Sequence, residues 1–184
     1  MKATGIVRRI DDLGRIVIPK EIRKTMRIRE GDPLEIYTDV DGIIILKKYS
    51  PIGELGDFAK EYAESLSKTS GHVTCITDRD SIIAVSGTSK KEYLEKPLSE
   101  QLEKLMQDKT KVAVKSPNEK TISILADEAA GKVYSSQVIS PIIAEGDAIG
   151  SVIIFSTDPS VKMGEVEMKL ADSASGFLGR QMEQ

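Results

Sequence analysis

The sequence predicts a two-domain protein, in which a small, mostly β domain over residues 1–50 precedes an α+β domain over residues 51–184. Short β-branched runs separated by turns fill the first domain, and apolar residues at helical spacing begin at Ile52. The charge is also asymmetric. The first 29 residues hold nine Lys/Arg against three Asp/Glu, or +6, so the net charge of −3 leaves −9 for the rest. A basic segment on an acidic body suits a unit that binds a polyanion, although a solvated charged surface accounts for the counts as well.

The first element is expected to be a β-hairpin. Two short runs rich in β-branched residues, GIVRRI (5–10) and RIVIP (15–19), flank the turn sequence DDLG. Pro19 then stands where a first helical position would be, and Ile22 and Met26 are four residues apart in the stretch that follows. The sequence therefore predicts two strands and one helix of about two turns.

A second hairpin follows. The runs LEIYT and IIILKK bracket Asp39-Val40-Asp41-Gly42, a pattern typical of a tight turn. Four strands and one short helix in fifty residues cannot cover their own apolar surface, since domains of this size bury only ~60% of what the open chain exposes. The single cysteine excludes an internal disulfide. We therefore expect an obligate dimer, in which strands of two copies share one core.

The second domain is expected to begin and end with helices. In the first helix the apolar residues recur at spacings of 3, 4, 3 and 4: Ile52, Leu55, Ala59, Tyr62 and Leu66. This helix either pairs with a partner helix or lies on the sheet of its own domain. In the last helix apolar residues again follow helical spacing: Val166, Leu170, Ala174, Phe177 and Leu178. Two such helices can pack together and against a second copy.

An antiparallel sheet is expected between these helices, with both on one of its faces. Apolar runs predict its strands, and SEQLEKLMQDK predicts a helix: the runs are HVTCITD, SIIAVSG, KVAVK, TISILAD, KVYSSQVISPIIA and AIGSVIIFSTD. The turns between strands are expected at Arg79-Asp80, Ser116-Pro117-Asn118, Ala130-Gly131 and Gly146-Asp147.

The candidate site residues are the basic residues of the first domain. Guanidinium groups flank the tip of the first hairpin, and further cations follow on the helix: Arg8, Arg9, Arg15, Arg23, Lys24 and Arg27, with Lys2 near the start of the chain. Arginine pairs with phosphates in a bidentate manner and donates to base edges in the major groove. No aromatic residue lies among them, which disfavours single-stranded nucleic acid. These residues predict a double-stranded DNA surface that doubles in a dimer.

The stretch TGIVRRIDDLGRIVIPKEIRKTMRIREGDPLEIY, followed by IIILKKY, resembles the swapped-hairpin DNA-binding domain of the AbrB-type transition-state regulators. The two-domain layout is similar to that of sporulation regulators in this family, whose second domain is of the GAF type. The resemblance implies a dimer that contacts A/T-rich, deformable DNA through Arg8, Arg15, Arg23 and Lys24. Relatives carry arginine where Lys24 stands, and lysine keeps the charge without the bidentate fork. It also implies a forespore regulator that both activates and represses transcription.

For the second domain, the GAF resemblance implies either a small-molecule pocket between the sheet and its covering loops or a purely dimerising role. Neither ligand nor cofactor is indicated by the residues, and we expect no metal site. Cys75 and His72 have a structural interpretation, as a small apolar strand residue and the opening of that strand. We expect the terminal helices to join subunits into a homotetramer, so that two tethered heads gain affinity.

Two other classes of protein, antitoxins and enzymes, fit the sequence less well. Antitoxins share the swapped-hairpin domain, but they usually carry a disordered tail, whereas residues 52–184 suggest a folded domain. An enzyme is not expected, because no nucleophile and base pair stands out around the single histidine. No window approaches the ~18 uncharged apolar residues of a membrane span, and no apolar secretory segment opens the chain, so we expect a cytoplasmic protein.

Overall fold

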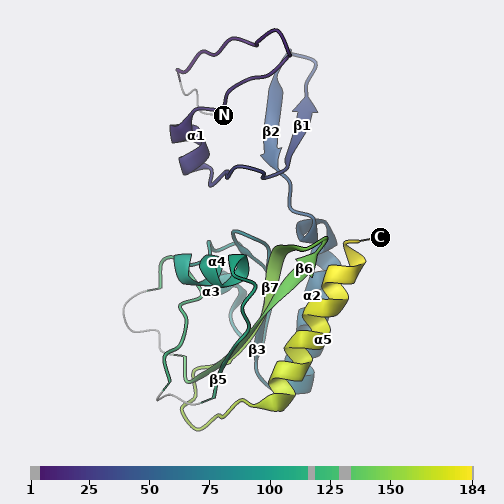
Figure 1. Cartoon of the computed structure of the whole chain (residues 1–184). Helices are drawn as coiled ribbons and strands as arrows, with labels where there is room; N and C mark the ends of the chain where they lie inside the picture. Colours follow the sequence, from purple (N-terminus) through teal and green to yellow (C-terminus); the bar gives the residue numbers. More distant parts are fainter. Residues whose placement is uncertain (1–4, 116–118, 129–133, 184) are drawn as a thin grey trace. The chain divides into compact units, whose positions relative to one another are not determined.

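The computed structural model describes residues 5–115, 119–128 and 134–183, and the chain divides into two compact units between Tyr49 and Ser50. Each unit is described by itself below (Figure 1). The N-terminal unit contains one short helix and one two-stranded sheet, namely α1 (Lys20–Thr25), β1 (Leu34–Thr38) and β2 (Ile44–Lys48).

The second predicted hairpin is confirmed as β1 and β2, which pair antiparallel with Leu34 opposite Lys48. The turn closes because the Asp39 amide donates to Ile43 O (3.0 Å) and the Gly42 amide donates to Asp39 O (3.1 Å). Gly42 adopts a φ of 75°, which glycine reaches without steric cost. The predicted short helix is present too. Pro19 is its N-cap residue rather than the first helical residue expected from the sequence, so the helix begins one position later.

The two strands predicted over residues 5–10 and 15–19 are not formed. The turn between them is present: the Asp11 amide donates to Arg15 O and the Gly14 amide to Asp11 O, both at 3.0 Å. The flanking runs, however, belong to no strand of the described chain. A strand exists only by pairing with a neighbouring strand, and neither run has a neighbouring strand among the described residues.

Most side chains of the N-terminal unit are exposed, and only some are half-buried. Among residues 5–49 only Pro19 is buried. Val7 is 85% exposed, Val17 72% and Ile36 66%, although all three have the residue types of a core. A unit with its apolar side chains in water is not stable by itself, because burial of apolar surface is the dominant favourable term in folding.

The C-terminal unit is built on a five-stranded antiparallel sheet with the order β4-β3-β7-β6-β5 (Figure 1). The two central hairpins, β3 with β4 and β6 with β7, are joined side by side through β3 and β7. Its strands are β3 (Val73–Thr77), β4 (Ile82–Ser86), β5 (Val112–Val114), β6 (Ser136–Ala144) and β7 (Asp147–Ser156). Its helices are η1 (Ile52–Leu55), α2 (Gly56–Ser70), α3 (Lys90–Tyr93), α4 (Glu100–Gln107) and α5 (Glu165–Gln181).

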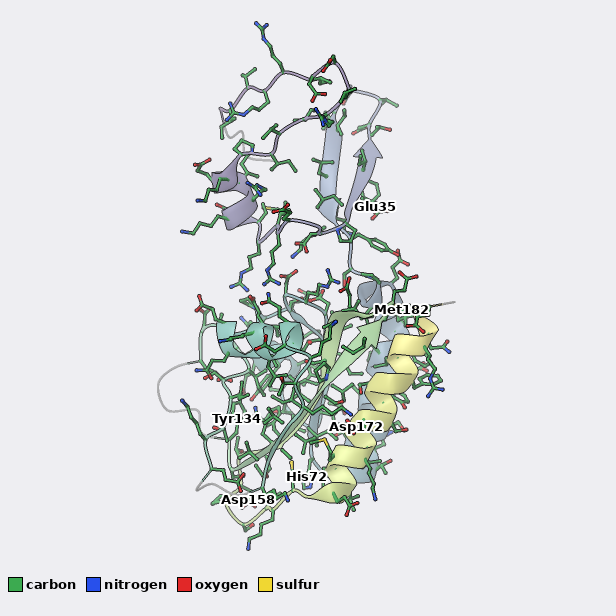
Figure 2. All side chains as sticks on the ribbon, in the orientation of Figure 1. Glu35, His72, Tyr134, Asp158, Asp172 and Met182 are labelled. Atoms are coloured by element: carbon green, nitrogen blue, oxygen red, sulfur yellow. The ribbon has the colours of Figure 1, made fainter. Side chains whose placement is uncertain are left out.

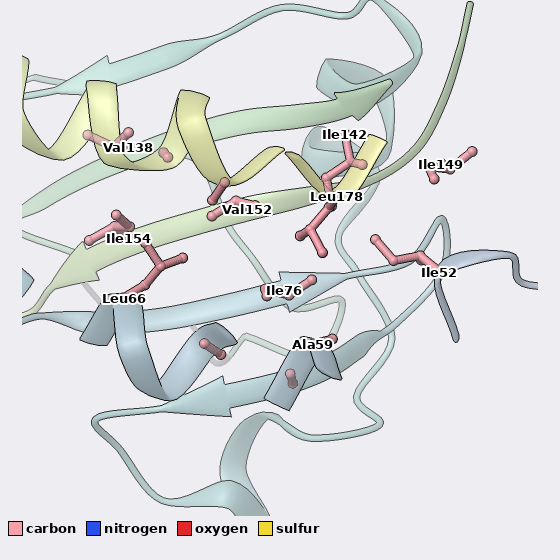
Figure 3. Close-up of a cluster of buried hydrophobic side chains, with 14 of the residues drawn as sticks. Ile52, Ala59, Leu66, Ile76, Val138, Ile142, Ile149, Val152, Ile154 and Leu178 are labelled. Atoms are coloured by element: carbon pink, nitrogen blue, oxygen red, sulfur yellow. The ribbon is translucent and has the colours of Figure 1, made fainter. Parts of the chain in front are cut away.

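The long helices α2 and α5 cover one face of this sheet, as predicted (Figure 3). Ile52, Ala59 and Leu66 from the predicted first helix are buried against strand residues such as Ile76 and Val152. Of the two alternatives for this helix, the structure shows that it lies on the sheet of its own unit.

The buried side of α5 differs partly from the prediction. Ala174 and Leu178 are buried as expected, but Val166 is 66% exposed and Phe177 38%. The buried line runs instead through Ala171, Ala174, Ser175, Leu178 and Gly179. Small residues face the sheet because the helix approaches it closely, and a Cβ added at Gly179 would meet Ile143 O at 2.1 Å.

The strand predicted for TISILAD (121–127) is also absent. The backbone of this segment is held by side chains rather than by a neighbouring strand. Gln137 accepts from the Ile122 amide and donates to Ile122 O, both at 2.9 Å, and the Ile124 amide donates to the Glu128 carboxylate. Its backbone groups thus find partners without a ladder, apart from one isolated bridge to Leu98. The predicted turns at 116–118 and 130–131 include residues outside the described chain.

Candidate functional site

The basic residues singled out in the sequence lie in two groups of the N-terminal unit. Arg8, Arg9 and Arg15 flank the turn formed by residues 11–14, and all three are exposed. The second group comprises Arg23 and Lys24 on α1 and Arg27 just beyond it, of which Arg23 is half-buried. Lys2 lies outside the described residues.

The turn between Arg9 and Arg15 is fixed by Asp11. One oxygen of its carboxylate accepts from the amides of Leu13 (3.0 Å) and Arg15 (2.7 Å). The other accepts from Arg15 Nε at 2.7 Å. The hydrogen bonds from the Arg15 amide and guanidinium lower the pKa of Asp11 below its usual value. Arg15 is therefore held in place by one nitrogen, and its side chain remains 69% exposed.

The end of α1 is the most strained part of this unit. Arg27 adopts a φ of 52°, in the left-handed region that disfavours any residue with a Cβ. Around it the Ile28 amide donates to Arg23 O (2.7 Å) and the Arg27 amide to Lys24 O (3.3 Å). These two bonds form the Schellman motif, in which glycine usually takes the left-handed position. An arginine at this position points to a role for its side chain that outweighs the strain.

The sequence analysis did not single out Lys48 and Asp32. Lys48 Nζ donates to the carbonyl oxygen of Arg27 at 2.9 Å and lies 3.4 Å from Asp32 Oδ2. The two residues are sixteen positions apart, and although both lie in the stretches that resemble the AbrB-type domain, nothing local indicates that they contact each other.

In the C-terminal unit, the sheet face opposite α2 and α5 is filled by aromatic side chains. The Phe155 ring lies 4.8 Å from the Tyr134 ring and 5.5 Å from the Tyr93 ring, and each residue is at most 2% exposed. The hydroxyl of Tyr134 donates to the Glu128 carboxylate, and burial raises the pKa of this phenol well above its usual range. Figure 2 labels Tyr134 together with Asp172, which is on α5. These three rings thus belong to the second apolar core of the unit.

An open groove of about 640 Å³ lies at the end of α2, and Phe155 is among its lining residues. Polar groups from several segments line it, among them Ser67, His72, Ser156 and Asp158. His72 and Asp158 are labelled in Figure 2. Cys75 is fully buried on β3, in agreement with its structural interpretation. Among the described residues no group of His, Cys, Asp and Glu is arranged to hold a metal ion.

The outer side of α2 and α5 carries a partly exposed aromatic cluster. The rings of Phe58, Tyr62 and Phe177 lie 5.7 to 6.0 Å from one another. Phe58 and Phe177 are each 38% exposed. Burial raises the pKa of the Tyr62 phenol. Such a cluster is unusual on a free surface and typical of an interface.

Comparison with known proteins decides the family. The family model described as stage V sporulation protein T C-terminal, transcription factor, matches residues 54–183. Stage V sporulation protein T of Bacillus subtilis (strain 168) is 58% identical over 184 residues, which is the whole of both chains. The chain belongs to the stage V sporulation protein T family. It is therefore a transcription regulator of sporulation, and this part of the predicted function is confirmed.

The N-terminal unit of this stage V sporulation protein T family member has relatives of its own. The transition state regulatory protein AbrB of the same bacterium is 65% identical over 51 residues, which are 28% of this chain and 52% of AbrB. A bacterial antitoxin model, antidote-toxin recognition MazE, matches residues 7–54.

The fold of the C-terminal unit is that of GAF domains. The GAF domain of an Acinetobacter phosphoenolpyruvate-protein phosphotransferase has a TM-score of 0.58 at 13% identity, covering 72% of this chain and 87% of the other. The cyanobacteriochrome receptor PixJ has a TM-score of 0.59 at 9% identity, covering 73% of this chain and 99% of the other. The predicted fold class, an AbrB-type domain followed by an α+β GAF-like domain, is confirmed. No described helix is long and apolar enough to cross a membrane.

Proposed function

We propose that this sporulation regulator binds A/T-rich double-stranded DNA through the basic residues of its N-terminal unit: Lys2, Arg8, Arg9, Arg15, Arg23, Lys24 and Arg27. The observation that carries the proposal is the exposed Arg15 guanidinium on a turn fixed by the Asp11 carboxylate, beside a short helix with further cations. Arginines on a fixed backbone suit phosphate pairing and base-edge contacts, because little conformational entropy is lost when they bind. The related AbrB sequence supports the assignment.

The DNA-binding form in this proposal is a dimer of the N-terminal unit. The exposed apolar side chains of residues 5–49 support it, since a second copy would cover them and also supply strand partners for residues 5–10 and 15–19. Swapping of strands between two copies satisfies both needs at once. A dimer presents the basic set twice, which suits two half-sites on a duplex.

The C-terminal units are proposed to join two such dimers into a homotetramer. The aromatic cluster of Phe58, Tyr62 and Phe177 is the surface that supports this, because large apolar rings at the outside of two terminal helices would be covered by a copy. Two tethered dimers would gain affinity for neighbouring DNA sites through effective concentration. The regulator is further proposed to act without catalysis, in the cytoplasm of the forespore.

A small-molecule ligand of the GAF-like unit is the remaining part of the proposal. The groove beside His72 is the proposed place for it, because it is open and is lined by polar groups such as Ser156 and Asp158 together with the Phe155 ring. Native mass spectrometry of the purified protein tests this idea. The expected spectrum contains an assembly whose mass exceeds a whole multiple of the bare-chain mass, and masses that are all whole multiples of the bare chain contradict ligand binding.

Fluorescence anisotropy with the full chain tests the proposed function. Wild-type protein is expected to bind an A/T-rich duplex more tightly than a G/C-rich duplex, and an A/T-rich single strand least. Equal affinity for the three would contradict duplex recognition, and no binding would remove the DNA-binding claim.

A second candidate, an antitoxin-like protein, is favoured by the match of the MazE model to residues 7–54. Residues 50–183 oppose it, because their described part folds into a GAF-like unit rather than a toxin-wrapping tail.

A further inference from the structure

Lys48, the last residue of β2, is directed at the end of α1. Its Nζ donates to the Arg27 carbonyl oxygen at 2.9 Å, and its side chain is only 24% exposed. Lysine side chains usually extend into water, and the neighbouring Lys47 is exposed in this way. Lys48 therefore differs from the other lysine of the same strand in what it contacts.

Asp32 holds Lys48 in this position. Its Oδ2 lies 3.4 Å from Lys48 Nζ and accepts from the Arg29 amide at 2.8 Å, and the side chain is only 6% exposed. A carboxylate this well covered needs both a countercharge and hydrogen bonds, and it finds them in Lys48 and the Arg29 backbone. The three groups tie the segment after α1 to β2.

The helix that receives this tie is too short to hold its own shape. α1 spans six residues, and isolated helices shorter than about 12 residues are marginal in water. Its end also contains Arg27 at a φ of 52°, a conformation that persists only where the surroundings impose it. The Lys48 ammonium group supplies such a constraint, because it binds the carbonyl oxygen of the strained residue itself.

We propose that Lys48, held by Asp32, is a positioning residue for DNA binding. It fixes the end of α1, and with it the directions of Arg23, Lys24 and Arg27, without contacting the nucleic acid. The inference rests on the proposed DNA-binding function and deepens it. Two basic residues of one strand thereby have different roles, one solvated and one structural.

Fluorescence anisotropy on an A/T-rich duplex across a salt series tests the proposal, with the full chain carrying Lys48→Met, Asp32→Asn or both substitutions. Lys48→Met is expected to weaken binding about tenfold. The slope of log K against log salt stays at the wild-type value, because Lys48 itself neutralises no phosphate and Arg23, Lys24 and Arg27 remain as cations beside the DNA. The double variant loses no more than the larger single loss, because the two residues act as one pair. Lys47→Met is the matched control and loses less affinity.

Asp32→Asn gives the sharpest distinction. The substitution removes a negative charge from a DNA-binding unit, so electrostatics alone would tighten binding. The proposal predicts the opposite, a loss of affinity. Tighter binding by Asp32→Asn, or a salt slope reduced by about 0.9 in Lys48→Met, would overturn it.

Thermal melting of each variant separates positioning from unfolding. Lys48→Arg keeps the charge and the donors, so it is expected to retain most of the affinity for DNA. If Lys48→Met lacks a melting transition, Lys48→Arg is the variant that tests the inference. A tenfold loss of affinity in a folded Lys48→Arg contradicts it. Absence of binding by the wild-type protein is a separate result. It refutes the proposed function, and the inference with it.

Discussion

At the residue scale, two charged groups determine the geometry of the basic N-terminal unit. The Asp11 carboxylate accepts three hydrogen bonds within its own turn, two of them from Arg15. At the other group, Arg27 holds a left-handed backbone at the end of α1. In both places a basic residue has a defined backbone conformation, and a single substitution can test each one.

Asp11→Asn should reduce the stability of the protein at neutral pH. Hydrogen bonds from Arg15 lower the pKa of Asp11, so the folded state binds the proton less readily than the unfolded state. Its contribution is then present above the unfolded value near 3.8 and is lost as the pH falls through the lower folded pKa. Thermal midpoints measured against pH should differ between wild type and variant at pH 7 and converge below that range. With Asp12→Asn as the control, a difference that stays constant down to acid pH would contradict the assignment.

Arg27→Gly should change stability and DNA binding in opposite directions. Glycine adopts a positive φ without the steric cost, but it also has greater entropy in the unfolded state. The net free energy of unfolding should rise by about 1 kcal/mol, and the thermal midpoint should rise with it. Affinity for duplex DNA should fall, with a salt slope smaller by about 0.9. Calorimetry and anisotropy on the same sample check both, and a lower midpoint would show that Arg27 is not strained.

At the scale of elements, the sequence predicts those helices and hairpins that local periodicity and turn residues determine. The hairpin of β1 and β2 has its turn at Gly42, and α2 buries Ala59 and Leu66 as their spacing indicates. Residues 15–19 have the same β-branched pattern yet form no strand, because no neighbouring strand of the described chain pairs with them. The Lys48 and Asp32 pair could not be predicted either, since only tertiary structure brings a strand end to the end of α1.

Two glycines of α5 give a matched test of how the helix lies on the sheet. A Cβ at Gly179 would meet Ile143 O at 2.1 Å, whereas one at Gly176 would meet nothing within 4 Å. Gly176→Ala should stabilise the protein by about 1 kcal/mol through helix propensity. Gly179→Ala should instead lower the thermal midpoint by several degrees, because the backbone of β6 must move away. Equal midpoints for the two variants would mean that α5 does not approach β6 this closely.

At the scale of the whole molecule, the two units differ in how complete they are. The C-terminal unit has an apolar core on each face of its sheet. Among residues 5–49 of the N-terminal unit only Pro19 is buried as a whole residue, and the proposed second copy would supply the missing cover. Assembly is consequently part of the account at this scale, and it can be measured directly.

Phe177→Ser should convert the proposed tetramer into a dimer. The substitution removes a ring that is 38% exposed from the cluster with Phe58 and Tyr62, and exposed serine costs the isolated unit little. Size-exclusion chromatography with light scattering should show half the wild-type mass. Val166→Ser is the control, because Val166 is an exposed apolar residue of the same helix. A dimeric wild type would contradict the tetramer, and a tetrameric Phe177→Ser would place the tetramer surface elsewhere.

The central claim is that the basic turn of the N-terminal unit binds duplex DNA. The most direct test compares wild type, Arg15→Ala and Arg180→Ala, an exposed arginine of α5, by anisotropy on an A/T-rich duplex at several salt concentrations. Wild type and Arg180→Ala should show steep salt dependence, whereas Arg15→Ala should bind more weakly, with a slope smaller by about 0.9 per site. Unchanged affinity and slope in Arg15→Ala would contradict the central claim.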